Sequence, residues 1–446
     1  MAFGAERLAG LLAALEPAWR TASWCVAVSG GIDSVVLLHA ISALRAGGQP
    51  FGLRAVHVDH GLQAQSPDWA GDCARLCEQL GVTFEVLHLR LGAAAGESVE
   101  AQARAARYAA LSRHLRAGEW LLTAHHEDDQ LETVLIQLLR GAGVSGLAGM
   151  PASAPLGAGR HGRPLLGVDR AAIAAYAAAH GLVFQRDPMN EDPRFDRGWL
   201  RSEVLPRLRS RWPAAAATVS RSAAHLAQAA RLLSEVARAD AQVVADGHRL
   251  SVAGLQGLSR DRQANLLRGW LRESRLRPPP AARLAAVLDE LLPGRADAQP
   301  LVRWPDGEIR RYRGRLYAMP PLPAAPGDAA LAPGTEGGVD LGVGCGRFSL
   351  VPGDTGRILT TLPAPLELRF RSGGESLRPG PGRPRKRLKD LCQEAGIVPW
   401  MRRRLPLVYA GGRLVAVADL WVEAEFQAPT GAPGLVPVWD GRPELF

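Results

Sequence analysis

A glycine-rich turn between a buried strand and a helix is the part of this chain best suited to chemistry. The apolar run at residues 25–28 predicts the strand, and the next residues read Ser29-Gly-Gly-Ile-Asp-Ser34. Adjacent glycines allow a sharp turn, and the apolar residues from Val35 onward predict a helix. Backbone N–H groups converge at such a turn, where the helix dipole also favours negative charge. We therefore expect an anion site, with Asp33 and Ser34 placed to serve a metal-bound phosphate.

This turn differs from the common phosphate-binding P-loop. That loop needs a lysine followed by Ser or Thr after its second glycine. The only lysines of this chain are Lys386 and Lys389, far from the turn. An ordinary strand–turn–helix with a glycine corner is the alternative interpretation, and the acid and serine that follow the glycines favour the anion site.

A second cluster, Ala124-His-His-Glu-Asp-Asp-Gln-Leu-Glu-Thr133, follows another predicted strand. On a helix, Asp129 and Glu132 are three residues apart and share one face. Acidic groups at the start of a helix suit a metal ion or a substrate ammonium, although they would also simply complement the helix dipole. The paired histidines resemble part of a zinc site, but no third ligand follows at a suitable spacing.

Three further groups could contact a ligand. His57 lies in a segment that ends the second strand, and either lines a ligand site there or belongs to a solvated strand end. Arg104 and Arg107 lie beside Tyr108 and could reach a phosphate or a base, or form one face of a solvated helix. Arg197 and Arg201 could contact RNA backbone or form a salt bridge within the domain. Two basic clusters of the C-terminal half could contact tRNA phosphates or form a solvated basic face: Arg383, Arg385, Lys386, Arg387 and Lys389 in one, and Arg402, Arg403 and Arg404 in the other.

Alternating strands and helices position the first of these groups. Strand-like runs at 25–28, 53–58, 84–89 and 120–124 alternate with helix-like stretches at 34–45, 68–80, 98–116 and 128–140. Such a series predicts a parallel sheet with helices on both faces. Ligands of these sheets bind at the carboxyl ends of the strands, where Ser29, Asp59 and His125 fall.

The fold class we predict is therefore α/β for the N-terminal part, followed by two smaller domains. Residues 1–213 form the domain that carries the expected anion site, 214–319 a mainly helical domain with a hairpin at 301–319, and 339–446 a small α+β domain around a helix at 387–394. Residues 320–338 are rich in Pro, Ala and Gly and predict a linker.

Composition bounds the class of protein. The chain has 446 residues, of which 47% are hydrophobic, enough for several cores. A net charge of +9 favours an anionic partner, although an arginine-biased surface would give the same charge. The five cysteines form no C-x-x-C pair, which favours a reducing cytosol. No signal peptide or membrane span is visible, so we expect a cytoplasmic protein with no membrane partner.

The motifs together resemble one family of the PP-loop ATP pyrophosphatases, the tRNA(Ile)-lysidine synthases in their long, three-domain form. The resemblance covers most of the chain and is weakest over 214–300. It is carried by SGGIDS at 29–34, HVDHGL at 57–62, EAQARAARY at 100–108, AHHEDDQLET at 124–133, RPLL at 163–166, DPMNEDPRFDRGWLR at 187–201, FRSGGESLRPG at 370–380, RKRLKDLCQEAGIVPWMRRRLPLVY at 385–409 and LVAVADLWV at 414–422.

The resemblance implies a two-step reaction on a tRNA(Ile) with a CAU anticodon. ATP adenylates the C2 oxygen of the wobble cytidine, and the ε-amine of free lysine then attacks C2 and expels AMP, so that the tRNA reads AUA in place of AUG. The cofactors implied are ATP and Mg²⁺, and a homodimer is possible in this family.

Site residues follow from the same match. We expect catalysis by Asp33, Asp129 and Glu132, with Mg²⁺ on Asp33 and Asp129. ATP binding is expected at Ser29, Gly30, Gly31, Ile32, Asp33, Ser34, His57 and His125. Substrate binding is expected at Asp128, Arg104, Arg107, Arg197, Arg201, Arg385, Lys386 and Lys389. The division of metal and lysine binding among Asp128, Asp129 and Glu132 stays open.

Two positions depart from the family pattern. Gly198 stands where the family usually has Asn, and Met189 stands where it usually has Ser.

Three other functions are alternatives to this one. A PP-loop tRNA thiolase usually carries paired C-x-x-C cysteines, which this chain lacks. An amidotransferase-type relative needs an ammonia-generating domain with a nucleophilic cysteine, and a non-catalytic RNA-binding protein would not need Asp33 and Ser34.

Overall fold

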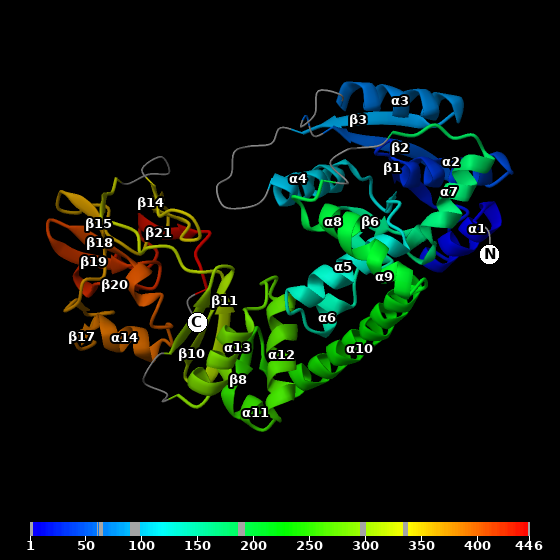
Figure 1. Ribbon diagram of the computed structural model, residues 1–446. Coiled ribbons are helices and arrows are strands. Elements are labelled where there is room, and N and C mark those ends of the chain that lie inside the picture. The colour runs from blue at the N-terminus through cyan, green and yellow to red at the C-terminus, as the bar shows by residue number, and fades with distance from the viewer. Residues whose placement is uncertain are drawn as a thin grey trace. The chain divides into compact units, whose positions relative to one another are not determined.

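The computed structural model describes residues 3–59, 61, 66–89, 99–185, 192–294, 300–332 and 338–444. The chain divides into two compact units, Met1–Ser234 and Glu235–Phe446 (Figure 1). Within the described ranges, no helix is both long and apolar enough to cross a membrane.

The first unit is built on a six-stranded sheet of order β3-β2-β1-β4-β6-β5. All neighbouring pairs are parallel except β5 with β6. The strands are β1 (Ser23–Ala27), β2 (Gly52–Asp59), β3 (Thr83–His88), β4 (Trp120–Leu122), β5 (Ser153–Leu156) and β6 (Gly159–Gly162). The predicted α/β class is confirmed, and β5 adds an antiparallel edge to the expected parallel sheet.

Helices cover both faces of this sheet because its central strands are apolar on both sides. Trp24 and Val26 of β1 pack into one core, whereas Cys25 between them packs into another with Leu111 of α4. This alternation is the period-two pattern of a strand buried on both faces. The helices are α1 (Ala5–Leu15), α2 (Ile32–Ala46), α3 (Ser66–Gln79), α4 (Val99–His114), α5 (Glu127–Leu139) and α7 (Arg170–Ala179).

The strand order creates a crevice between β1 and β4. After β1 the chain adds β2 and β3 on one side, and β4 then pairs with β1 on the other. Open parallel sheets bind ligands where the strand order reverses in this way. The glycine-rich turn after β1 and the acidic cluster after β4 therefore face each other across the crevice.

A chain segment C-terminal to the sheet returns to the same edge. It comprises α8 (Asp196–Trp199), the π-helical turn η3 (Leu200–Val204) and α9 (Leu205–Arg211). Leu205 of α9 packs on Leu131 of α5 in a small core of its own. The long helix α10 (Ala215–Val244) follows.

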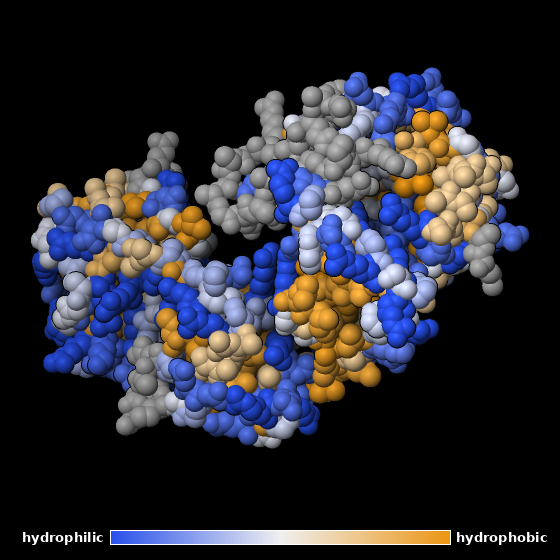
Figure 2. All heavy atoms as spheres, in the orientation of Figure 1, coloured by the Kyte–Doolittle hydropathy of each residue, from blue (hydrophilic) through white to orange (hydrophobic). Residues whose placement is uncertain are grey.

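Apolar residues are exposed at the C-terminal end of α5, before the short helix α6 (Val144–Leu147). Leu138 is 56% exposed and Leu139 is 76% exposed. Figure 2 shows a large apolar surface in the region where Figure 1 places α5 and α6. Large contiguous apolar patches on a protein surface often mark a site of contact with another molecule.

The second unit begins with helices that pack on a five-stranded antiparallel sheet of order β7-β8-β11-β10-β9. The sequence predicted only a hairpin at 301–319, but these residues form three strands, and the last of them, β11, also pairs with β8. The two-residue turn at Arg313 and Gly314 has φ values of 48° and 72°, which suit a tight hairpin. The elements are β7 (Ala245–Asp246), β8 (Arg249–Ser251), α11 (Val252–Gln256), α12 (Arg260–Glu273), α13 (Ala281–Ala286), the π-helical turn η4 (Val287–Leu291), β9 (Leu301–Trp304), β10 (Gly307–Tyr312) and β11 (Arg315–Met319).

The C-terminal part of this unit consists of short strands around one helix, as predicted. One sheet has the order β12-β15-β18-β19-β20 and another the order β13-β14-β21, and β16 pairs with β17. Within the segment predicted as a linker, β12 pairs with β15. The elements are β12 (Ala329–Ala330), β13 (Val339–Asp340), β14 (Arg347–Gly353), β15 (Leu366–Phe370), β16 (Ser376–Leu377), β17 (Lys386–Arg387), α14 (Leu388–Glu394), β18 (Pro406–Ala410), β19 (Arg413–Val417), β20 (Trp421–Val422) and β21 (Gly434–Asp440).

A buried ion pair ties β2 to the start of β4. Arg54 Nε lies 2.7 Å from Glu119 Oε1, and Arg54 Nη2 lies 2.7 Å from Glu119 Oε2. The two side chains are only 6% and 1% exposed. Loss of Glu119 would leave the buried Arg54 with only the partly exposed Glu85, whose Oε1 lies 3.2 Å from Arg54 Nη1. Removing one member of a buried pair costs far more than removing one member of a surface pair.

We predict that Glu119→Ala lowers the free energy of unfolding of the first unit by about 3 kcal/mol. Urea denaturation followed by tryptophan fluorescence measures the change. The matched control is Asp196→Ala, which removes the partner of Arg140 in a pair with both side chains more than 60% exposed and should cost less than about 1 kcal/mol. Equal losses in the two variants would contradict the prediction.

Candidate active site

The glycine-rich turn is closed by its own serines. Ser34 Oγ donates to the carbonyl of Gly31 at 2.9 Å and accepts from the backbone N–H of Ser29 at 3.1 Å. Gly30 has a φ of +85°, a conformation that residues with a Cβ rarely adopt. These contacts hold the turn in one shape before any ligand binds.

The N-terminus of α2 is left open to an anion. Gly31 is its N-cap and offers no side-chain acceptor, so the first N–H groups of the helix have no capping partner from it. The N–H groups of Ile32, Asp33 and Ser34 belong to this first turn. This open helix end lies where the sequence predicts an anion site, and the helix dipole also favours negative charge there.

The N-terminus of α5 is instead capped by its own residues. The backbone N–H of Asp128 donates to His126 Nδ1 at 3.2 Å, and the N–H of His126 donates to Asp129 Oδ2 at 3.0 Å. Burial opposes ionisation of Asp129, but His126, whose backbone N–H also donates to the carboxylate, and Arg201 together hold the pKa of its carboxyl below the usual value. Asp129 is therefore fixed in place as a carboxylate.

Two arginines from the returning segment neutralise most of the acidic cluster. Arg201 Nε lies 2.5 Å from Glu132 Oε1, and Arg201 Nη2 lies 3.0 Å from both Glu132 Oε2 and Asp129 Oδ1. Arg209 Nη2 lies 2.7 Å from Asp128 Oδ2. Of the two alternatives for Arg201, RNA contact or an internal salt bridge, the structure contains the salt bridge.

Arg197 is engaged more loosely than Arg201. Its Nη2 donates to Thr133 Oγ1 at 3.1 Å, and its Nη1 lies 4.0 Å from Glu132 Oε2. The side chain also lines the cavity between the glycine-rich turn and helix α4. Arg197 can therefore turn toward a ligand at the loss of one hydrogen bond.

Asp33 differs from the carboxylates of the acidic cluster on α5, because one of its buried oxygens has no hydrogen-bond partner among the described residues. Its Oδ1 is buried without one and lies 3.6 Å from His126 Nε2. Burial raises the pKa of Asp33, and the neighbouring His126 offsets this only in part. A buried carboxylate oxygen without a hydrogen bond, in the same cavity as the Asp129 carboxylate, suits a hard divalent cation such as Mg²⁺. The predicted metal pair Asp33 and Asp129 fits the ion in this respect.

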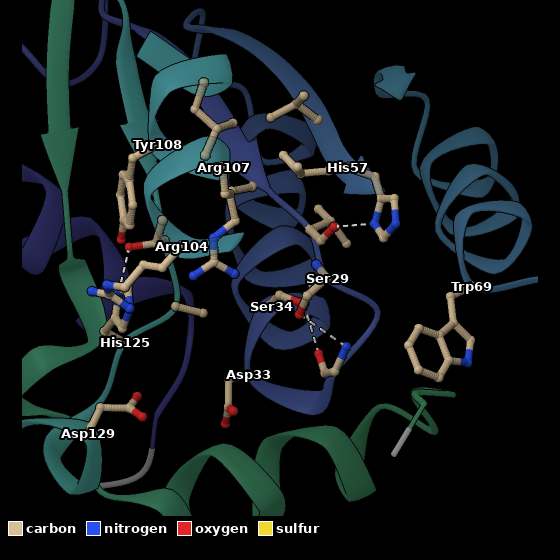
Figure 3. A pocket seen from close by; sticks show the side chains of 18 of the residues that line it. Ser29, Asp33, Ser34, His57, Trp69, Arg104, Arg107, Tyr108, His125 and Asp129 are labelled. Atoms are coloured by element: carbon tan, nitrogen blue, oxygen red, sulfur yellow. Dashed lines mark hydrogen bonds between the residues drawn. The ribbon is translucent and has the colours of Figure 1, made fainter. Parts of the chain in front are cut away.

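These groups line a cavity of about 380 Å³ at the carboxyl ends of β1, β2 and β4. Figure 3 shows Ser29, Ser34 and Asp33 on one wall, with Asp129 and His125 on another. The cavity thus joins most of the site residues predicted in the first unit; its lining also includes His57, Asp59, Trp69, Arg104, Arg107, Tyr108, Thr123, Gln185, Arg197 and Arg201.

The strand β2 and helix α3 form the apolar wall of this cavity. His57 Nδ1 donates to the carbonyl of Val28 at 2.8 Å, and burial lowers the pKa of its imidazole. The ring is therefore neutral, and its Nε2 is the remaining acceptor. Trp69 from the first turn of α3 also lines the cavity. The sequence analysis did not identify Trp69. The signal that could have found it is its position in the first turn of the helix after β2, next to the carboxyl ends of the strands.

Helix α4 places a concentration of positive charge on the opposite wall. Arg104 and Arg107 flank the ring of Tyr108, at 5.3 Å and 5.7 Å from its centroid. No carboxylate lies within 4.0 Å of either guanidinium among the residues that the structure describes. Burial lowers the pKa of Arg107, which reflects the cost of keeping its charge away from water. An anionic ligand would relieve that cost.

A second cavity, of about 780 Å³, lies on the other side of Asp33 and Arg201, which line both cavities. Asp128, Glu132, Arg170 and Arg209 supply its charged wall. Its apolar wall is formed by Ala174, Ala177, Leu182, Phe184 and Leu205. Sequence reasoning missed Arg209, whose position two helical turns after Arg201 is the only signal that points to it.

The predicted substrate cations of the second unit differ in their partners. Arg385 Nη2 lies 3.1 Å from Glu423 Oε1, and Lys386 Nζ lies 2.8 Å from Glu394 Oε1. Within the described residues, no carboxylate pairs with Lys389, which is exposed at the start of α14. Arg385 and Lys386 must therefore give up an ion pair to bind phosphate, and Lys389 has no such pair to the described part of the chain.

The two departures from the family pattern have different outcomes. A Cβ at Gly198 would lie 1.9 Å from the carbonyl oxygen of Asp192, so this backbone approach requires glycine. The turn around Asp192 therefore occupies the space that the family's asparagine side chain would need. Met189 and the rest of the stretch 186–191 lie outside the described residues.

The sheet, the open turn and the acidic cluster define a PP-loop ATP-binding domain, and comparison with known proteins agrees. A family model for the PP-loop domain matches residues 6–208. Models for the TilS substrate binding domain and the TilS substrate C-terminal domain match residues 250–317 and 366–439.

Relatives that match along nearly the whole chain carry one name, tRNA(Ile)-lysidine synthase. The relative from Alkalilimnicola ehrlichii is 45% identical over 96% of this chain and 95% of its own length. Those from Pseudomonas aeruginosa and Methylococcus capsulatus are 43% and 41% identical over 95% and 92% of this chain, and over 98% and 93% of their own lengths. The chain belongs to the tRNA(Ile)-lysidine synthase family.

We predict that Asp33→Asn stabilises the protein slightly while it removes activity. A carboxyl with a raised pKa destabilises the folded state once it ionises, so stability is lost as the pH rises through the folded pKa. The gain should be at most about 1 kcal/mol at pH 7 and should vanish below the ordinary pKa of an aspartate, about 3.9. Thermal unfolding in chelator-containing buffer across this pH range measures it. If the variant is less stable than the parent at pH 7, the ionised Asp33 carboxylate does not destabilise the folded state, and the prediction is wrong.

Proposed function

We propose that this chain is a ligase that attaches free lysine to the wobble cytidine of tRNA(Ile) with a CAU anticodon. The observation that carries the proposal is one cavity in which an open helix N-terminus faces buried carboxylates and the two arginines of α4. This arrangement suits an ATP whose α-phosphorus is attacked by an oxygen of a polyanionic substrate. Full-length identity of up to 45% to tRNA(Ile)-lysidine synthases supports the same reaction.

The first step adenylates the cytidine. ATP binds with its phosphates at the turn Ser29 to Ser34 and its adenine toward His57 and Trp69, so that pyrophosphate leaves against the N–H groups of α2. The C2 oxygen of the cytidine attacks the α-phosphorus, and the bond to pyrophosphate breaks. Arg104 and Arg107 contribute positive charge that stabilises the phosphates, and His125 lies near the acceptor base.

Mg²⁺ is the metal that this chemistry and these oxygen donors favour. Asp33 and Asp129 would hold it, and when bound it supplies charge neutralisation for the pyrophosphate leaving group. Asp33 is well suited because its buried oxygen has no competing hydrogen bond within the described residues.

The second step transfers lysine. We place the lysine in the second cavity, because its apolar wall fits a four-carbon chain and its charged wall offers both signs. Arg170 can pair with the lysine carboxylate, while Asp128, Asp129 and Glu132 surround the path of the ε-amine. A free amine with a reference pKa near about 10.4 must lose a proton before attack, and Asp129 and Glu132 are the proposed acceptors. Attack at C2 breaks the bond to the AMP oxygen, and AMP leaves.

Lysine transfer tests the function directly. The protein is incubated with ATP, Mg²⁺, radiolabelled lysine and unmodified tRNA(Ile) transcripts that carry CAU. We expect label in the tRNA, lost when the wobble cytidine is replaced by uridine and reduced at least about a hundredfold in Asp33→Ala. AMP formation without label transfer would keep the ATP chemistry and exclude lysine, and absence of both would exclude the enzyme.

Cations of the second unit are proposed to bind tRNA backbone, with Lys389 contributing more than Arg385 or Lys386. Among the described residues Lys389 has no carboxylate partner to give up, whereas the other two are ion-paired. A phosphate contact adds roughly one to the slope of log affinity against log salt concentration.

We therefore predict that Lys389→Gln raises the KM for tRNA several-fold and lowers its salt slope by about one. The control Lys386→Gln, a nearby lysine that is already ion-paired, should leave the slope nearly unchanged. Steady-state kinetics between low and moderate salt give both values. A larger effect of Lys386→Gln than of Lys389→Gln would reverse the assignment.

A further inference from the structure

One half-buried hydroxyl at the wall of the first cavity connects two imidazoles. Thr123 Oγ1 lies 2.8 Å from His125 Nδ1 and 2.8 Å from His161 Nε2. Thr123 directly follows β4, and its backbone N–H donates to the carbonyl of Gly162 at 3.0 Å, next to His161 on β6. His161 is 3% exposed and does not line the cavity, whereas Thr123 and His125 do.

Both imidazoles are uncharged. Burial, followed by the arginines that surround them, lowers the pKa of His125 to about 3 and that of His161 to about 3. Arg104 and Arg107 of α4 and Arg163 after β6 act on both rings, and Asp129 of α5 opposes them at His125. The ring of Tyr108 packs on His161 at a centroid distance of 5.5 Å.

The hydroxyl couples the tautomers of the two neutral rings. Thr123 has one proton to donate, so it donates to one imidazole and accepts an N–H from the other. If it donates to His161, then His125 Nδ1 carries the proton and His125 Nε2 is an acceptor. If it donates to His125, then His125 Nε2 carries the proton and is a donor. His125 Nε2 is the ring nitrogen left for a ligand in the cavity.

We propose that Thr123 and His161 are positioning residues that hold His125 as a hydrogen-bond acceptor for the exocyclic amine of the acceptor cytosine. The inference rests on the proposed function and assigns a role to Thr123, which lines the cavity, and to His161, which does not. The guanidiniums of Arg104 and Arg107 in the cavity favour a lone pair, rather than an N–H, directed toward them. Arg163 acts on His125 in the same direction and Asp129 in the opposite one, and we take the three guanidiniums together to favour the acceptor form.

An acceptor at this place selects cytosine by chemistry. Cytosine presents an amine at C4 where uracil presents a carbonyl oxygen, and two acceptors facing each other leave both unsatisfied. Adenylation of the C2 oxygen withdraws electrons from the ring and makes the amine a stronger donor. A neutral acceptor is then worth more in the adenylated state than in the ground state, which is the condition for a contribution to rate.

The test compares two tRNAs and three proteins. One tRNA carries cytidine at the wobble position; the other carries the 2-pyrimidinone ribonucleoside, which keeps the C2 oxygen and lacks the amine. The proteins are the parent, Thr123→Val, which removes the hydroxyl at nearly constant volume, and Thr123→Ser, which retains it. The rate of tRNA-dependent pyrophosphate release gives kcat/KM for adenylation.

We expect the parent and Thr123→Ser to prefer cytidine by about tenfold or more, and Thr123→Val to lose most of that preference. His161→Leu should behave as Thr123→Val does, whereas His161→Gln, which keeps an acceptor for the hydroxyl, should retain the preference. Equal losses on both tRNAs in Thr123→Val would show a purely structural role and overturn the proposal. A parent that acts on neither tRNA would instead overturn the proposed function.

Discussion

Mutual repulsion among four carboxylates is the constraint on which the rest of the first unit depends. Asp33, Asp128, Asp129 and Glu132 gather where the N-termini of α2 and α5 meet, on buried or half-buried positions. Helix dipoles and His126 offset part of that charge. The remainder is offset by Arg201 and Arg209, which explains why the segment after the sheet must fold back onto its carboxyl edge.

The neutralisation is incomplete in a way that suits function. Glu132 and Asp128 each have an arginine partner, and Asp129 has both a backbone donor and a guanidinium. Asp33 keeps a buried oxygen without a donor from the described residues. The opposite wall carries an excess of positive charge. Among the residues that the structure describes, no carboxylate forms an ion pair with Arg104 or Arg107. A metal cation bound at Asp33 would compensate the negative charge of the first wall. A polyphosphate between the two walls would compensate the positive charge of Arg104 and Arg107.

The sequence was sufficient for the sheet and the turn because their signals are local. An apolar strand, two glycines and a helix predict the strand–turn–helix at Ser29 to Ser34 without knowledge of any residue far away in the sequence. The pairing of Arg201 with Glu132, and of Arg209 with Asp128, depends on residues about 70 to 80 positions apart, and helical spacing alone left salt bridge and RNA contact equally open. The sheet that joins β8 to β11 was missed because strands of two or three residues are too short to show a period. The role of His161 has no sequence signal at all, since only the fold brings it to Thr123.

The central claim of this account is that the wobble cytidine itself attacks ATP through its C2 oxygen within the first cavity. The direct measurement uses tRNA(Ile) whose wobble cytidine carries oxygen-18 at C2, incubated with the protein, ATP, Mg²⁺ and lysine, with the AMP analysed by mass spectrometry. The account predicts one oxygen-18 atom in the AMP, because lysine expels AMP together with that oxygen. AMP without oxygen-18, formed alongside lysine-bearing tRNA, would contradict it.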